Sequence, residues 1–303
     1  MDAVSELFLG LHFRIAFLER KGTAFQDWFV TLARHALGPD FEPIRPYGRQ
    51  GDWKCDGRQL STGTIFQCYA PDTEADKQTI RKINDDFPGA LAKWPNFIQA
   101  WIFVHNDPRG VPPTIANHLD QMRRSYPRIN FQIWSQPELF VLFNKMDSNA
   151  KRLMFGAVPD RSLVDGLALE DLKPVVDALE RRDPDPKFGL PPPPSVQKLE
   201  KNDLSAEAAD ILRMGRHKVR LVETYFQKTG PVEHGEKIAE AFRKQYAYLK
   251  SLELTADQVF MHLQKYAGVQ GEPRRQAAAM AVLAYLFDSC DIFEDPEIEA
   301  PGT

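Results

Sequence analysis

The sequence predicts an α/β domain, a mixed β-sheet flanked by helices, followed by an all-α domain. Strand-like and helical segments alternate over the first half of the chain. A proline-rich segment at residues 183–195 then interrupts the chain, and everything beyond it has a helical pattern. The 303 residues suffice for two domains of ordinary size. We expect a first domain at residues 1–160, a helix and proline-rich linker at 161–202, and a helical domain at 203–303.

The first half opens with an amphipathic helix and continues into short strands. Phe25, Trp28, Phe29 and Leu32 recur at spacings of three and four, which predicts a helix over residues 22–38. An extended stretch follows at residues 41–47, and strands are expected at 51–57 and 64–71, on either side of a Ser-Thr-Gly turn at 61–63.

Helices and strands then alternate as far as the end of the first domain. The expected elements are a helix at 74–92 broken near Pro88, a strand at 97–105, a helix at 113–124, a strand at 129–134 and a helix at 137–146. The strand at 97–105 is almost continuously apolar, which is typical of a strand buried on both faces.

The second half is predicted to be a helical assembly. After a helix at 163–182, the expected helices span residues 205–229, 235–252, 256–267 and 274–292. Ser205 and Thr255 precede two of these segments and are suited to cap them.

Composition excludes several classes of protein. Hydrophobic residues make up 43% and charged residues 26% of the chain, and the net charge is −4, so any nucleic-acid contact needs a local basic patch. Three scattered cysteines suit neither a disulfide framework nor a zinc knuckle. We find neither a signal-peptide pattern nor an apolar run of the roughly 18 residues that cross a bilayer, and we expect a cytoplasmic protein without a membrane partner.

The chemistry-bearing residues gather on the two strands at 51–57 and 64–71. The first carries Asp52 and Asp56, and the second carries Gln67 and Tyr69 at alternate positions, so pairing brings these side chains to one sheet edge. Carboxylate and amide oxygens suit Mg²⁺ or Mn²⁺, which assigns Asp56, Gln67 and the Cys68 carbonyl as ligands, with Asp52 as a supporting or second-metal ligand. A bound ion polarises a phosphate and lowers the pKa of water, as phosphodiester hydrolysis requires.

The string Gly-Asp-x-x-x-Asp-Gly, followed by Phe-Gln-x-Tyr, resembles the Mrr-type branch of the restriction-endonuclease-like (PD-(D/E)xK) fold, over residues 25–142. The resemblance implies a metal-dependent DNA endonuclease in which Asp56 is the metal-binding aspartate and Gln67 takes the Glu/Gln position. Tyr69 stands where the family has its lysine, and tyrosine is neutral at pH 7. Lys54, on the face of Asp56, and Lys77, in the next helix, are the two candidates to supply the missing charge.

Arginines and lysines around this motif are candidate DNA contacts, because phosphates bind cationic side chains. We assign Arg49, Arg58 and Lys77 to that role.

The C-terminal half is similar to C-terminal domains of bacterial ABC three-component conflict systems. The similarity is carried by Phe-Arg-Lys-Gln-Tyr at 242–246, by the segment 260–268 and by the segment 284–293. It implies a hetero-oligomeric anti-phage complex in which this chain is the effector, mounted on an ABC-type ATPase and a small middle subunit. The ATPase would then control the nuclease.

Two other interpretations stay open. The first is a catalytically inactive nuclease-fold adaptor that binds DNA or partner proteins, which Tyr69 favours. The second is a structural subunit without a nucleic-acid role.

Overall fold

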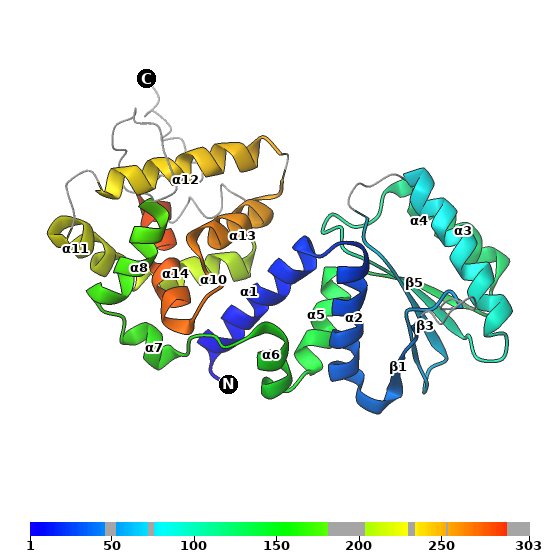
Figure 1. The fold of residues 1–303 in the computed structure, drawn as a ribbon. Helices are drawn as coiled ribbons and strands as arrows, with labels where there is room; N and C mark the ends of the chain where they lie inside the picture. Colours follow the sequence, from blue (N-terminus) through cyan, green and yellow to red (C-terminus); the bar gives the residue numbers. More distant parts are fainter. Residues whose placement is uncertain (46–52, 72–75, 181–203, 230–233, 253, 290–303) are drawn as a thin grey trace, which may run out of the picture. The chain divides into compact units, whose positions relative to one another are not determined.

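The computed structural model describes residues 1–45, 53–71, 76–180, 204–229, 234–252 and 254–289 (Figure 1). The chain divides into two compact units, residues 12–156 and residues 1–11 with 157–303. The first is an α/β unit and the second is helical wherever it is described, which confirms the predicted fold class. The proposed limits at 160 and 202 stay predictions.

A five-stranded mixed sheet organises the α/β unit. Its strands are β1 (Phe41–Pro43), β2 (Gly57–Gln59), β3 (Thr64–Tyr69), β4 (Ala100–His105) and β5 (Asn130–Trp134), in that spatial order. The first three are antiparallel, and β3, β4 and β5 are parallel. Gln67 of β3 stands opposite Phe103 of β4, and Arg58 of β2 opposite Ile65 of β3.

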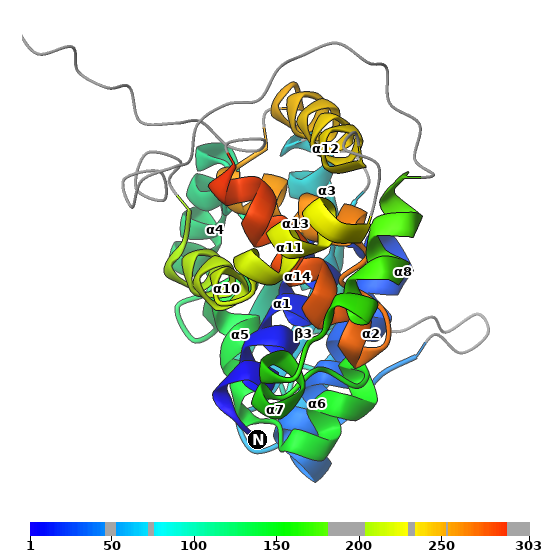
Figure 2. The same ribbon diagram turned by 90° about the vertical axis from the view of Figure 1, so that its left-hand side faces the viewer.

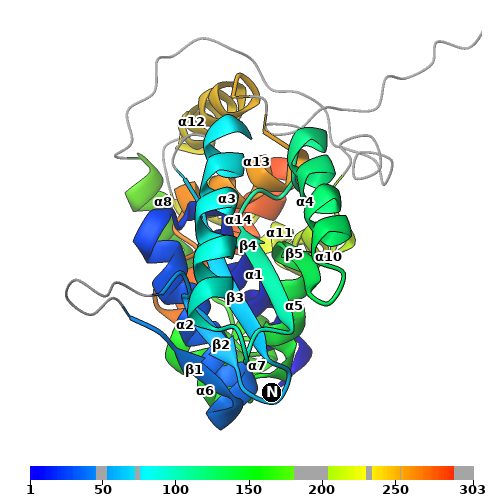
Figure 3. The same ribbon diagram turned by 90° about the vertical axis from the view of Figure 1, so that its right-hand side faces the viewer.

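Helices cover both faces of the sheet. Helices α2 (Gly22–Leu37) and α5 (Gln136–Lys145) lie on one face, and α3 (Asp76–Lys93) and α4 (Pro113–Ser125) lie on the other (Figures 1 and 3). A short 3₁₀ turn, η1 (Gly38–Asp40), joins α2 to β1, and α6 (Ser148–Phe155) closes the unit.

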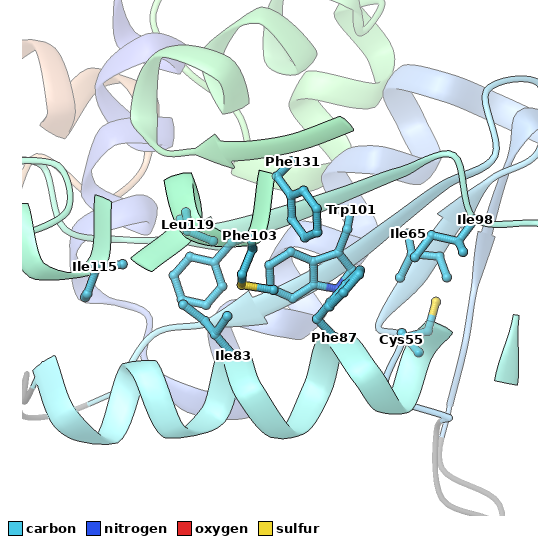
Figure 4. Packing of buried hydrophobic residues seen from close by; sticks show 12 residues of the cluster. Cys55, Ile65, Ile83, Phe87, Ile98, Trp101, Phe103, Ile115, Leu119 and Phe131 are labelled. Atoms are coloured by element: carbon cyan, nitrogen blue, oxygen red, sulfur yellow. The ribbon is translucent and has the colours of Figure 1, made fainter. Parts of the chain in front are cut away.

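One hydrophobic core of this unit lies between the sheet and helices α3 and α4. Trp101 is fully buried there, with its ring 5.8 Å from Phe87 of α3 and 6.0 Å from Phe103 (Figure 4). On β3, Ile65 belongs to this cluster, whereas Phe66 packs on Phe29 of α2. The alternation along β3 therefore places Gln67 and Tyr69 on the α3 side of the sheet.

The helical unit is built around α14 (Pro273–Asp288), whose described side chains are mostly buried (Figure 2). The other helices are α7 (Arg161–Asp165), α8 (Leu169–Glu180), α10 (Ala206–Arg216), α11 (Val219–Thr229), α12 (His234–Lys250) and α13 (Ala256–Ala267). Ser205 and Thr255 accept hydrogen bonds from the first turns of α10 and α13, which confirms both predicted caps. Among the described helices, none is both long and apolar enough to cross a membrane.

Several expected elements differ from the structure. Helix α3 continues through Pro88, so the expected break is wrong; Phe87 and Ala90, on either side of it, are buried and hold the helix in place. The predicted strand at 51–57 starts only at Gly57, because Trp53 and Lys54 adopt left-handed φ angles of 54° and 58°. The predicted helices at 163–182 and 205–229 are each two helices.

Helix α1 (Ala3–Glu19) was not expected. Its apolar residues surround the helix instead of forming one stripe, and Phe8, Leu9, Phe13 and Phe17 are all buried. The proline-rich segment at 183–195 lies outside the described residues, and its role as a linker stays a prediction.

Candidate functional site

Asp56 is tied into the start of the sheet by its backbone and its side chain. Its N–H donates to the carbonyl of Phe66 (3.0 Å), and its carbonyl accepts from Ile44 N–H (3.2 Å). One carboxylate oxygen, Oδ2, accepts from the N–H of Cys68 on β3 (2.6 Å). The aspartate therefore lies beside β3 at the position where the metal-binding carboxylate was predicted.

Gln67 presents a buried polar atom next to this segment. Its side-chain oxygen Oε1 is shielded from solvent and has no hydrogen-bond partner among the described residues. A buried amide oxygen without a partner costs free energy, and such a group in a native fold calls for an explanation. A cation bound beside Asp56 would supply one.

The two side chains are close to inaccessible in this structure. Asp56 is 2% exposed and Gln67 is 4% exposed. A metal ion and a phosphate cannot reach them without a local opening.

Lysines reach this region from two directions and share one acid. Asp86 of α3 is buried and accepts Lys54 Nζ on Oδ1 (2.9 Å) and Lys82 Nζ on Oδ2 (2.5 Å). Lys54, predicted as a replacement cation, is thus held by α3.

Lys82 was missed in the sequence and lies close to Tyr69, the position at which the resembled family has its lysine. Its Nζ lies 5.9 Å from the ring centroid of Tyr69, which is tilted against the ring of Phe103. The signal was available: Thr79, Ile83, Phe87 and Ala90 form the buried stripe of α3, and Lys82 and Asp86 fall within the same helical period.

The pKa of the Cys68 thiol is affected by both Asp56 and Lys82. Burial raises the pKa of its thiol well above the usual value, and the Asp56 carboxylate raises that pKa further, whereas Lys82 acts in the opposite direction. Asp56 and Lys82 therefore both act on the same point of β3. The thiol therefore stays protonated at pH 7.

Of the other predicted residues that the structure describes, Arg58 and Lys77 are not seen to contact this group. Arg58 of β2 pairs with Glu42 (Nη2 to Oε2, 2.7 Å), and its guanidinium lies over the ring of Trp94 at 4.6 Å. Lys77 is exposed in the first turn of α3. Asp52 and Arg49 lie outside the described residues, so their predicted roles stay predictions.

A small pocket of about 30 Å³ opens at the carboxyl ends of β3 and β4, lined among others by Tyr69, Phe103 and His105. His105 Nδ1 accepts from the N–H of Asp107 (3.2 Å), and Nε2 is buried without a partner in the structure. Burial lowers the pKa of His105 to about 4, against the opposing charges of Asp107 and Glu138, so the imidazole is neutral at pH 7.

The arrangement offers one carboxylate, one amide oxygen and a shared lysine pair. Within the described parts of the chain, no three His, Cys, Asp or Glu side chains converge as a metal site. A closed structural metal cage is therefore not what these residues form. An open site that takes its remaining ligands from water and phosphate needs fewer protein groups.

Comparison with known proteins gives one finding. Residues 170–294 match the family model for C-terminal domain 10 of the ABC-three component (ABC-3C) systems. The C-terminal part is thus of the ABC-3C kind. This confirms the resemblance of the helical half and supports a component of a bacterial ABC-three-component defence system, which works as a complex with other subunits. Neither a curated protein nor a solved structure matches the chain.

Proposed function

We propose that this chain is the effector of its ABC-3C complex and that its α/β unit is a metal-dependent DNA endonuclease. The single observation that carries the proposal is the Asp56 carboxylate bound to β3 beside the buried, unpartnered amide oxygen of Gln67. The ABC-3C match at residues 170–294 supplies the context of a multi-component complex. Control by a partner ATPase is part of the same proposal.

A divalent ion fits the donors that are present. Mg²⁺ is bound in proteins through one or two carboxylates and completes its shell with waters and phosphate oxygens. Asp56 supplies the carboxylate, and the oxygen of Gln67 is the neutral donor that lacks any other partner. The bound ion would activate water and polarise the scissile phosphate.

Lys82 takes the role that Tyr69 cannot fill. A cation near the reacting phosphate stabilises the charge that develops there. Lys82 is one-third exposed, at 34%, and its ion-pair partner Asp86 also accepts Lys54. Asp86 fixes the position of both amines.

Burial of Asp56 and Gln67 gives the proposed nuclease a resting state. A site that substrate cannot reach is inactive until a local opening exposes it. Such a resting state suits an enzyme whose uncontrolled activity would harm its host. The partner subunits would open the site when the complex is triggered.

Plasmid cleavage tests this function. Purified complex is incubated with supercoiled DNA and Mg²⁺, with Asp56→Asn and Lys82→Ala variants and with Asp120→Asn as a matched control for a lost surface carboxylate. We expect nicking by the wild type and the control, and a loss of at least about 100-fold in both site variants. Cleavage that persists in Asp56→Asn would exclude the proposed site.

A non-catalytic adaptor is the second candidate, and burial together with Tyr69 favours it. It predicts that wild type and Asp56→Asn assemble with their partners equally well, and that neither cleaves DNA with Mg²⁺ or Mn²⁺. The cleavage assay therefore separates the two functions.

A further inference from the structure

Beside the candidate site, the α/β unit carries a cluster of aromatic rings, here called the Trp53 patch: the exposed Trp53 and the half-buried Trp94 and Phe97, with Arg58 and Lys93. The rings of Trp53 and Trp94 lie 5.2 Å apart, and those of Trp94 and Phe97 lie 6.2 Å apart. Trp53 is 37% exposed, which is high for the largest apolar side chain.

Cations accompany these rings. The Arg58 guanidinium lies 4.6 Å from the ring centroid of Trp94 and 4.9 Å from that of Phe97, and Lys93 Nζ lies 5.8 Å from that of Trp53. Among the described residues, Glu42 pairs with Arg58. The described part of the patch thus holds two cations, one of them paired with a carboxylate.

Contacts with α3 and Trp94 stabilise an unfavourable backbone conformation at Trp53 and Lys54. Trp53 and Lys54 are consecutive residues with left-handed φ angles of 54° and 58°, a conformation that costs free energy for side chains of this size. The Lys54–Asp86 ion pair and a hydrogen bond from Trp94 Nε1 to the Trp53 carbonyl (3.3 Å) fix the turn. Gly89 makes room for it, because a Cβ there would lie 2.7 Å from Lys54 Cγ.

The same turn leads into Asp56. Trp53 stands three positions before the proposed metal ligand, and Arg58 two positions after it. Because these residues are so few positions apart in the sequence, a ligand bound to the Trp53 patch lies near the proposed site.

We propose that the Trp53 patch binds an unpaired nucleotide, by stacking a base on Trp53 while Lys93 and Arg58 contact its phosphates. An exposed aromatic face with adjacent cations is what single-stranded nucleic acid uses, since every base offers a π-face and every nucleotide a charge. A proline-rich peptide also binds aromatic surfaces, but it gains nothing from the two cations. This inference rests on the proposed function, because the α/β unit is expected to bind nucleic acid only if it is a nuclease.

Binding of a fluorescently labelled dT₁₂ oligonucleotide to the full chain tests the proposal. The titration is run in EDTA, so that cleavage plays no part, and is repeated with a 12-base-pair duplex and with a proline-rich peptide as competitors. Trp53→Ala should weaken dT₁₂ binding by about 5- to 150-fold, the measured range for loss of one base stack, and Trp53→Phe should restore most of the affinity. Lys93→Gln should lower the salt dependence of binding by about one phosphate contact.

Two controls separate the possible failures. Tyr248→Ala removes an aromatic side chain that is 58% exposed in the helical unit and should leave affinity unchanged. Asp56→Asn should abolish cleavage and keep dT₁₂ binding. Binding to the Trp53 patch can therefore be tested even if the protein proves not to be a nuclease. Equal affinity of wild type and Trp53→Ala, stronger binding of the duplex or the peptide, or no dT₁₂ binding at all would each overturn the inference.

Discussion

At the scale of single residues, the most consequential group is a carboxylate that no sequence motif singled out. Asp86 is buried and holds two lysines, one from the strained turn before Asp56 and one from its own helix. It therefore couples the position of the turn to that of the lysine proposed to act on phosphate. Its effect on the site is positional, through the two amines.

Asp86→Asn keeps the size of the side chain and removes its charge. We expect the α/β unit to lose about 1–3 kcal/mol of unfolding free energy, the usual contribution of hydrogen bonds to a charged partner. All five tryptophans lie between residues 28 and 134, so urea unfolding followed by tryptophan fluorescence reports on this unit. Asp120→Asn, which breaks the exposed Asp120–Arg123 pair, should change stability by less than about 0.5 kcal/mol. Equal effects of the two variants would contradict the account.

His105 makes stability depend on pH in a defined direction. Its pKa is about 4 when folded, against 6.5 ordinarily, so the unfolded chain binds the extra proton between those values. The unfolding free energy should therefore fall as the pH falls from 6.5 to 4, by up to about 3 kcal/mol from this residue. His105→Gln should flatten that fall when wild type and variant are unfolded in urea at pH 7 and 4.5. Parallel losses in both proteins would show that His105 has no such part.

At the scale of secondary-structure elements, the sequence predicts positions better than it predicts local backbone conformation. The apolar run at 97–105 and the stripe of α2 correspond to real elements because periodicity follows directly from burial. The strand predicted at 51–57 begins only at Gly57, because the residue types of Trp53 and Lys54 do not predict two left-handed φ angles. That turn depends on contacts with Asp86 and Trp94, which lie far along the chain. Lys82 was missed although the periodicity of α3 places it beside the buried stripe, because periodicity alone does not show what that stripe faces.

Gly57 illustrates a constraint at the edge of the sheet. A Cβ at this position would lie 2.3 Å from the ring of Phe41, which is buried and cannot move aside. Gly57→Ala should destabilise the α/β unit by about 1–3 kcal/mol through overpacking, as followed by tryptophan fluorescence in urea.

The matched variant is Gly235→Ala in α12, where the new Cβ meets only ordinary contacts of 3.4 Å or more. That change should be neutral or slightly stabilising, measured by circular dichroism of the whole chain. An unaffected Gly57→Ala protein would mean that β1 and β2 adapt more freely than their packing implies.

At the scale of the whole molecule, the chain joins an α/β unit with a proposed active site to a helical unit of the ABC-3C kind. In the proposed function, the helical unit mounts the chain in its complex and the α/β unit cleaves DNA. Composition and patterning were enough to foresee the two classes of unit. The burial of Asp56 and Gln67 was not foreseeable, because periodicity does not show which other segments pack over a strand.

The most direct test of the central claim is a Mn²⁺ titration of the full chain, with the unbound ion followed by electron paramagnetic resonance. If Asp56 and Gln67 hold one divalent ion, the wild type should bind Mn²⁺ at one site. Binding should be at least tenfold weaker in Asp56→Asn and in Gln67→Leu, and unchanged in Asp120→Asn. Wild-type protein that binds no Mn²⁺, or Asp56→Asn protein that binds it as tightly as the wild type, would contradict the claim.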